Sequence, residues 1–317
     1  MADHVEVASS ARLHLGFLDL NFSLGRRFGS LGMLLDGPET GVRLRRAEGT
    51  TVCGPEGERA ARALAVMAAH LGAEGGHALE VVRALPAHAG LGSGTQLALA
   101  VAAALRRLHG IAPDGRGDAA RLGRGARSGV GVALFEQGGL VLDGGRGEGT
   151  EVPPLLARLA VPESWRVLLL LNPQGEGLSG RAERAAFAEL PPMADATAGE
   201  ICRLALMQAL PALAEADLPG FGAAITAIQE RLGDHFAPAQ GGRFTSPRVA
   251  AALAALRCLG APGVGQSSWG PTGFAFARDE AEARRLRGAL LAEGGGEGLD
   301  IQVRRPLNRG ARIRGGP

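Results

Sequence analysis

Residues 86–96 have the sequence Pro86-Ala87-His88-Ala89-Gly90-Leu91-Gly92-Ser93-Gly94-Thr95-Gln96, which is the sharpest local feature of the chain. It joins an alternating apolar and polar run at 78–85, which predicts a strand, to a run at 94–108 with helical spacing. Glycines let the backbone approach a ligand, and the free N–H groups at a helix start attract anions. The stretch therefore predicts a phosphate-binding loop, with an ordinary capped strand-to-helix turn as the alternative.

The charge of the chain excludes several classes of function. Its 317 residues carry 34 Lys+Arg against 32 Asp+Glu, a formal net charge of +2, so no basic arm for nucleic acid is indicated. All of these cations are arginines, because the chain contains no lysine. A Schiff-base lysine, a P-loop lysine and a lysine base are therefore excluded.

The cysteines and the apolar runs predict a soluble cytoplasmic protein. Cys53, Cys202 and Cys258 lie far apart, so neither a disulfide framework nor a zinc site is indicated, and we expect buried thiols. No apolar run approaches the roughly 18 residues of a membrane-spanning helix. The N-terminus lacks a basic region followed by an apolar core, so no secretory signal is predicted.

The remaining patterns predict an α+β protein in two lobes. Helices are expected at 58–71, at 279–293 and in a segment opened by Ser246-Pro247. Because strands and helices do not alternate as regular βαβ units, a doubly wound sheet is disfavoured. We expect an N-terminal domain at 1–160, which contains the phosphate loop, and a C-terminal domain at 161–317. The strands are predicted at 5–17, 41–46, 78–85, 167–171, 273–277 and 299–303.

Three motifs together resemble the GHMP family, the small-molecule kinases for galactose, homoserine, mevalonate and phosphomevalonate. Residues 86–96 resemble the phosphate loop of the family, residues 265–274 its glycine-rich third motif, and residues 11–20 stand where its first motif lies. The resemblance implies an N-terminal lobe like ribosomal S5 domain 2 and a ferredoxin-like C-terminal lobe. It also implies that phosphate or diphosphate is bound by Gly90, Leu91, Gly92, Ser93, Gly94, Thr95 and Gln96.

One departure from the kinase pattern separates this chain from most of the family. Kinases of the family commonly carry S-G-x-D before a helix, whereas the corresponding run here is Ser128-Gly129-Val130-Gly131. Glycine thus occupies the place of the acid that orients or deprotonates the alcohol. Together with the absence of lysine, this favours a reaction other than phosphoryl transfer.

The combined motifs are similar to a synthase branch of the family that belongs to tetrahydromethanopterin biosynthesis. That resemblance implies a decarboxylating pentosyltransferase, which condenses 4-aminobenzoate or a close analogue with 5-phosphoribosyl 1-diphosphate and releases CO₂ and diphosphate. It implies Mg²⁺, no need for ATP, and a homodimer. An ATP-dependent small-molecule kinase and a non-catalytic metabolite sensor are the alternatives.

The resemblance and the demands of this reaction suggest further site residues. Arg124 and Arg127 offer guanidinium groups to the phosphates, and Arg12 offers one to the carboxylate of the aromatic acid. His14 is placed to move a proton or to bind the ring substituent. The aromatic ring is assigned to Ser267, Ser268, Trp269 and Gly270, and the catalytic group is completed by Asp19 and Ser128.

Most of these residues also have an ordinary structural interpretation. Arg12 and His14 alternate with leucines, so they fit a solvated strand face, and Asp19 fits an Asx turn. Arginines on a glycine-rich loop are often solvated, and Asp143 fits a turn better than a ligand. The segment 172–180 is explained equally well by a lid and by helix capping at Ser179.

Overall fold

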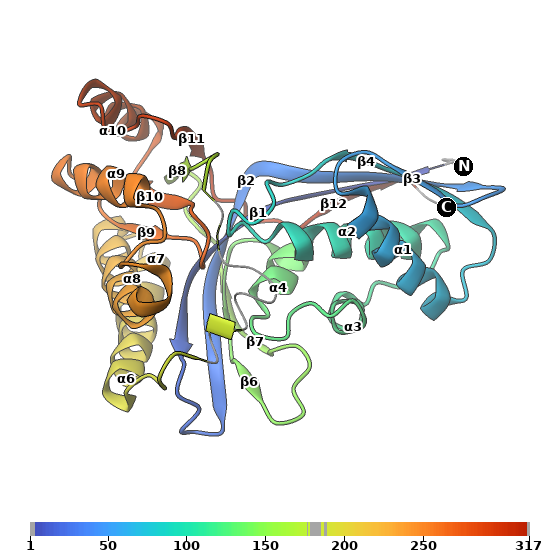
Figure 1. The fold of residues 1–317 in the computed structure, drawn as a ribbon, viewed down its shortest axis with the longest axis horizontal. Coiled ribbons are helices and arrows are strands. Elements are labelled where there is room, and N and C mark those ends of the chain that lie inside the picture. The colour runs from blue at the N-terminus through green and yellow to red at the C-terminus, as the bar shows by residue number, and fades with distance from the viewer. Residues whose placement is uncertain (1–3, 176, 178–184, 187–188, 316–317) are drawn as a thin grey trace.

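The computed structural model describes residues 4–175, 177, 185–186 and 189–315, and they form two lobes (Figure 1). The N-terminal lobe is built on two long antiparallel strands, β1 (His4–Asp19) and β2 (Arg26–Ala47). Its sheet runs in the order β12-β1-β2-β4-β3, with β5, β6 and β7 attached along β2 and β5. The shorter strands are β3 (Thr51–Cys53), β4 (Gly76–Arg83), β5 (Leu140–Asp143), β6 (Arg146–Gly147), β7 (Leu155–Leu159) and β12 (Arg312–Gly315).

Two helices pack side by side against this sheet and position the phosphate loop (Figure 1). They are α1 (Gly57–Leu71) and α2 (Ser93–Leu108), which confirm the helices predicted at 58–71 and 94–108. Along α2, Leu97, Val101 and Leu105 are buried in one cluster with Val42 and Leu79 of the sheet. Burial of this apolar stripe fixes the helix, so its N-terminus is held at the end of the loop. Two shorter helices, α3 (Gly115–Arg121) and α4 (Val130–Gln137), complete the lobe.

The C-terminal lobe has the predicted ferredoxin-like topology. Its four antiparallel strands run in the order β11-β8-β10-β9, so the first strand of the lobe lies between the fourth and the third. Helix α9 (Pro247–Cys258), capped by Ser246 as predicted, and helix α10 (Glu280–Ala292) share a buried cluster with Leu168 and Leu170 of β8. The four strands are β8 (Arg166–Leu171), β9 (Val264–Gln266), β10 (Gly273–Ala277) and β11 (Asp300–Arg304).

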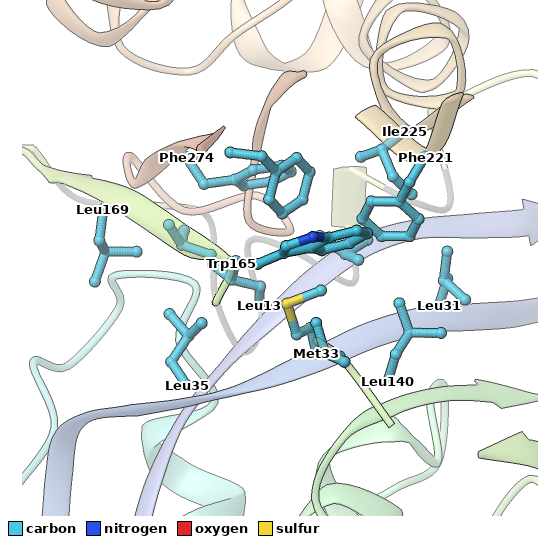
Figure 2. Packing of buried hydrophobic residues seen from close by; sticks show 14 of the residues in the cluster. Leu13, Leu31, Met33, Leu35, Leu140, Trp165, Leu169, Phe221, Ile225 and Phe274 are labelled. Atoms are coloured by element: carbon cyan, nitrogen blue, oxygen red, sulfur yellow. The ribbon is translucent and has the colours of Figure 1, made fainter. Parts of the chain in front are cut away.

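One hydrophobic core joins the two lobes. Figure 2 shows Trp165 between Met33 of β2 and Phe221 of α8 (Leu218–Gln240), and the rings of Trp165 and Phe221 lie 5.4 Å apart. The predicted domain boundary at residue 160 falls in the connection between β7 and β8, and the last strand, β12, returns to pair with β1. The C-terminal lobe is completed by α6 (Asp195–Leu204), the π-helical turn η1 (Ala205–Ala209) and α7 (Leu210–Ala214).

Three sequence expectations need correction or fall outside the described chain. The strand predicted at 41–46 is the end of β2, which begins at Arg26. Cys53 and Cys258 are exposed thiols and Cys202 is half-buried, so the expected burial is wrong for the first two. Within the ranges that the structure describes, no helix is both long and apolar enough to cross a membrane. The lid or cap predicted around Ser179 lies outside the described residues.

Candidate active site

A cleft of about 900 Å³ lies where the loop 86–96, the start of α1, the loop 123–127 and the loop 268–270 meet. It brings together eleven of the residues that the sequence analysis selected. Its wall also contains seven that were not selected, from α1 and its N-terminal turn, from the phosphate loop and from the loop 123–127. The predicted residues in the wall are Arg12, Gly90, Gly92, Ser93, Gly94, Thr95, Arg124, Arg127, Ser268, Trp269 and Gly270, and the additional ones are Glu56, Gly57, Glu58, Arg59, Arg62, His88 and Gly123.

The two glycine-rich loops touch backbone to backbone. Gly90 has a φ of 76°, and a Cβ on it would lie 2.2 Å from the carbonyl oxygen of Ser267. A Cβ on Gly270 would lie 2.4 Å from the carbonyl carbon of Ala89. The buried Ser267 hydroxyl donates to the Gly90 carbonyl at 2.8 Å and accepts from the His14 N–H at 3.0 Å. Ser267 therefore fixes the phosphate loop and β1 to the third motif, and its side chain is not part of the cleft wall.

Arginines surround the N-terminus of α2. A Cβ on Gly94 would lie 2.4 Å from Nη2 of Arg59 and 3.1 Å from Nη1 of Arg124, so both guanidinium groups lie against the first turn of the helix. Arg59 is held by an ion pair with Glu56 at 2.9 Å. Burial, followed by the charges of Arg59 and Arg62, lowers the pKa of Arg124. Cations concentrated at a helix N-terminus make this end of the cleft a site for an anion.

Arg12 lies along the phosphate loop. Its Nη1 donates to the Gly90 carbonyl at 2.5 Å, and its backbone N–H donates to the Leu91 carbonyl at 3.1 Å. A Cβ on Gly92 would lie 2.9 Å from Cγ of Arg12, so only glycine leaves room for this stem. Arg12 is therefore anchored at the cleft, and its strand face is not solvated as the alternative interpretation required.

His14, two residues along β1, is 3% exposed. Burial, followed by the positive charges of Arg12 and Arg127, lowers the pKa of His14 well below its usual value. The ring is therefore neutral at physiological pH, and one of its nitrogens can accept a hydrogen bond. His14 lines a small recess that has two residues, Ser268 and Trp269, in common with the cleft wall.

The structure leaves little of Trp269 available to a ligand. The side chain is 2% exposed, and its ring packs edge-on against Phe236 with centroids 4.6 Å apart. It belongs to a buried cluster that includes Phe17 and Phe28. Trp269 therefore has no exposed face on which a substrate ring could stack, which was the role suggested from the sequence.

Besides His14 and Ser267, four predicted site residues keep their side chains away from the cleft wall. Asp19 accepts from the backbone N–H of Asn21 at 2.8 Å, which is an Asx turn at the end of β1. Leu91 is buried in the core between the lobes. Gln96 is fully buried and donates from Nε2 to the Gly131 carbonyl at 3.0 Å. Ser128 donates to Asp143 at 3.3 Å and accepts from the Val130 N–H.

Gly131, which stands where the kinases carry an acid, faces the phosphate loop. A Cβ at this position would lie 3.1 Å from Cγ2 of Thr95. A longer acidic side chain would therefore press on Thr95 at the cleft wall. Because of this departure from the kinase pattern, position 131 places no acidic side chain beside Thr95.

Asp143 is a buried carboxylate that holds the loop before α4. Its Oδ2 accepts from the Gly129 N–H at 2.8 Å and its Oδ1 from the Gly145 N–H at 2.9 Å. Burial raises the pKa of Asp143 to about 6, although these hydrogen bonds oppose the shift. The turn role suggested from the sequence thus extends to the loop that carries Arg127 and Ser128.

We expect the stability of Asp143→Asn to differ from wild type in a pH-dependent way. Since the folded-state pKa of Asp143 exceeds its unfolded value, the folded protein binds more protons between about pH 4 and pH 6. The wild type should therefore lose stability relative to the variant as the pH rises through this window, by about 3 kcal/mol at most. Urea unfolding of both proteins at pH 4, 5, 6 and 7 measures this difference. A constant difference across the series would contradict a buried, titrating Asp143.

Sequence reasoning missed Arg59 and Arg62 because they belong to the polar side of an amphipathic helix. The spacing of Glu56, Arg59 and Arg62 is that of a solvated, ion-paired helix face. Only the position of α1 beside the start of α2 turns these side chains toward the phosphate loop. Their alignment with Gly94 is a tertiary feature that no local pattern records.

Comparison with known families agrees with this architecture. A model of the GHMP kinase N-terminal domain matches residues 58–139, and a model of the GHMP kinase C-terminal domain matches residues 209–296. The structure of homoserine kinase from Cytophaga hutchinsonii superimposes with a TM-score of 0.71 at 19% identity, covering 99% of this chain and 98% of the kinase. At that identity the likeness concerns the fold alone. The fold and the loop site thus define a protein of the GHMP class.

Two relatives narrow the class to one branch. β-Ribofuranosylphenol 5′-phosphate synthase of Archaeoglobus fulgidus is 36% identical over 98% of this chain and 99% of its own length. The enzyme of the same name from Methanothermobacter thermautotrophicus is 32% identical over 84% of this chain and 86% of its own. The chain belongs to the GHMP family and, within it, to the branch of these synthases. The predicted resemblance, to the enzyme also named for its β-ribofuranosylaminobenzene 5′-phosphate product, is confirmed.

Proposed function

We propose that this chain joins the anomeric carbon of 5-phosphoribosyl 1-diphosphate to the ring of a 4-substituted benzoate, with release of CO₂ and diphosphate. The observation that carries the proposal is a single cleft in which five arginines meet the N-terminus of α2. A substrate with a 5-phosphate and a diphosphate requires this concentration of positive charge. The name of the relatives supports a ribosyl 5′-phosphate product on a phenol ring.

The leaving diphosphate is assigned to the start of α2. Arg59 and Arg124 lie against Gly94, and the backbone N–H groups of Ser93 and Gly94, the first two residues of the helix, have no preceding turn to supply a carbonyl partner. These groups are in place before the reaction, so they stabilise the charge that develops on the diphosphate as its bond to the sugar breaks. Arg12 and Arg127 remain for the 5-phosphate and for the carboxylate of the aromatic acid.

Mg²⁺, which the resemblance implies, fits the acidic edge of the cleft. Glu56 and Glu58 line the wall beside Arg59 and Arg62, and Mg²⁺ is commonly bound by one or two carboxylates together with substrate phosphates. When bound with the diphosphate, the ion would neutralise part of the leaving-group charge. The described residues, those of the cleft included, contain no cluster of three or more acidic, histidine or cysteine side chains that could hold a metal, so the substrate phosphates would supply the remaining ligands.

The identity of the aromatic acid follows from the ring substituent of the product. The sequence analysis expected 4-aminobenzoate or a close analogue, and a phenol product corresponds to 4-hydroxybenzoate. We propose both acids as substrates. The homodimer, the cytoplasmic location and the place in tetrahydromethanopterin biosynthesis stay predictions.

The proposal is tested by release of labelled CO₂. Purified protein is incubated with carboxyl-labelled 4-hydroxybenzoate or 4-aminobenzoate, 5-phosphoribosyl 1-diphosphate and Mg²⁺, with and without ATP. We expect release that requires the ribosyl donor, falls when Mg²⁺ is chelated and does not change with ATP. Omission of the donor is the matched control. Folded protein that releases no CO₂ from either acid, or that phosphorylates an alcohol with ATP, would overturn the proposal.

A further inference from the structure

A small recess adjoins the part of the cleft wall formed by Ser268 and Trp269. Its free volume is about 20 Å³, room for one group the size of a water molecule. Phe17, Leu232, Phe236 and Trp269 line it with apolar surface, and His14 supplies an imidazole. Because Ser268 and Trp269 also line the cleft, a ligand in the cleft lies next to this recess.

The imidazole of His14 presents an unused polar atom in the recess. Its Nε2 is buried and has no hydrogen-bond partner anywhere in the chain as described, although the side chain is only 3% exposed. An unpartnered polar atom in the interior lowers the stability of the fold by about 1–3 kcal/mol. A polar group of the substrate would supply the missing hydrogen-bond partner.

Three other polar side chains of the recess, those of Gln229, Gln266 and Arg243, already have hydrogen-bond or ion-pair partners. Gln229 donates to the Leu15 carbonyl at 2.7 Å and accepts from the Gln266 N–H at 2.8 Å. Gln266 in turn donates to the Ser268 carbonyl at 3.0 Å and accepts from the Thr245 N–H at 2.7 Å. Arg243 pairs with Asp234 at 2.8 Å. These contacts leave Nε2 of His14 unsatisfied, so a ligand in the recess can engage it as a hydrogen-bond acceptor.

We propose that the recess receives the para hydroxyl of the aromatic acid and that Nε2 of His14 takes the proton of this hydroxyl as the ring attacks the anomeric carbon. The inference rests on the proposed function and adds the residue that activates the ring. The recess admits a hydroxyl or an amine and excludes a larger substituent. The rest of the ring, with its carboxylate, lies in the arginine-lined cleft.

The step balances without any further reactant. A bond forms between the ring carbon that bears the carboxylate and the anomeric carbon, while the anomeric C–O bond breaks and diphosphate leaves with the bonding pair. The O–H electron pair moves toward the ring as His14 takes the proton, which gives a dienone with the carboxylate on a tetrahedral carbon. Loss of CO₂ returns an electron pair to the ring, and the imidazolium returns the proton to the oxygen.

The two candidate acids depend on His14 to different extents. A phenol becomes a much stronger electron donor when its proton is removed, and a positioned base commonly contributes about 10²–10⁴-fold to such a step. The amine of 4-aminobenzoate donates its free electron pair without losing a proton. The proposal therefore predicts a difference between two substrates on the same protein, which a general loss of structure would not produce.

The test compares wild type and His14→Gln with both acids. Glutamine can still bond a hydroxyl but cannot take its proton, so kcat for 4-hydroxybenzoate should fall about 100-fold or more with little change in KM. The kcat for 4-aminobenzoate should fall less than about 10-fold. His77→Asn, a change at another buried histidine that lies outside both the recess and the cleft wall, controls for stability and should leave the ratio of the two rates at its wild-type value. Equal losses on both acids in His14→Gln would overturn the inference.

A measurement on the wild type alone covers the case in which His14→Gln does not fold. With 4-methoxybenzoate, which has no proton to give and a substituent larger than the recess, we expect at least a 100-fold lower rate than with 4-hydroxybenzoate. Comparable rates would overturn the inference while leaving the ribosyl transfer intact. Failure of the proposed function itself would differ, because the wild type would then release no CO₂ from 4-hydroxybenzoate or 4-aminobenzoate.

Discussion

Gly90→Ala should abolish product formation and lower the free energy of unfolding by about 3 kcal/mol or more. The φ of 76° at this position costs a side-chain-bearing residue about 1–2 kcal/mol by itself. The added Cβ would also lie 2.2 Å from the Ser267 carbonyl oxygen and 3.0 Å from the Cα of Gly270. Both neighbours are backbone atoms that cannot rotate away, so the two loops must separate. Separation removes the anchor of Arg12, whose guanidinium donates to the Gly90 carbonyl.

A control at Gly72 separates the conformational cost of a positive φ from the cost of the clash between the loops. Gly72, the C-cap of α1, has a φ of 59°, and a Cβ added to it would meet no atom within 4 Å. Gly72→Ala therefore carries the conformational cost without the clash, and it should lose only about 1–2 kcal/mol and keep full turnover. Urea unfolding and CO₂ release measure both variants. Equal stability losses, or normal turnover in Gly90→Ala, would show that contact between the loops does not hold the site together.

Local patterns predicted the elements whose ends are capped or sharply bounded. The helix at 247–258 begins where Ser246-Pro247 indicated, because the serine accepts from the Val249 N–H and proline tolerates the first turn. The first half of β2 was missed because residues 26–40 are rich in glycine and are buried on both faces around Leu34, so no alternation marks them. β12 was missed because its arginines resemble a charged tail, and only pairing with β1 makes it a strand.

The candidate site could be located from the sequence, but not every role could be assigned. Period-two spacing placed Arg12 and His14 on one face of a strand, and the structure agrees. Whether that face meets solvent depends on the loop at 265–270 and on α8, which cover it. The same holds for Trp269. A tryptophan at this position suggested a stacking platform for the substrate, but in the structure its ring packs against Phe236. Exposure is set by partners distant in sequence, so composition and spacing do not determine it.

Arg124→Met should reduce kcat/KM for the ribosyl donor by about 10²–10³-fold without reducing stability. Removing one preorganised donor to a developing negative charge commonly costs this much in rate. Loss of Arg124 should not lower the free energy of unfolding, because Arg124 is partly buried and the charges of Arg59 and Arg62 repel its own. Methionine keeps much of the length of the side chain and removes this repulsion, so the melting temperature should stay constant or rise.

Arg121→Met is the control for a charge lost near, but outside, the cleft. Arg121 lies on α3 and pairs with Asp114 at 3.1 Å, and its removal should leave turnover unchanged. Calorimetry with inorganic diphosphate gives a readout independent of catalysis, in which Arg124→Met should bind at least about tenfold more weakly than either wild type or Arg121→Met. Unchanged diphosphate affinity in Arg124→Met would remove this arginine from the anion site. A protein that gains stability while losing its ligand would indicate that the cluster of cations around α2 is maintained for binding rather than for folding.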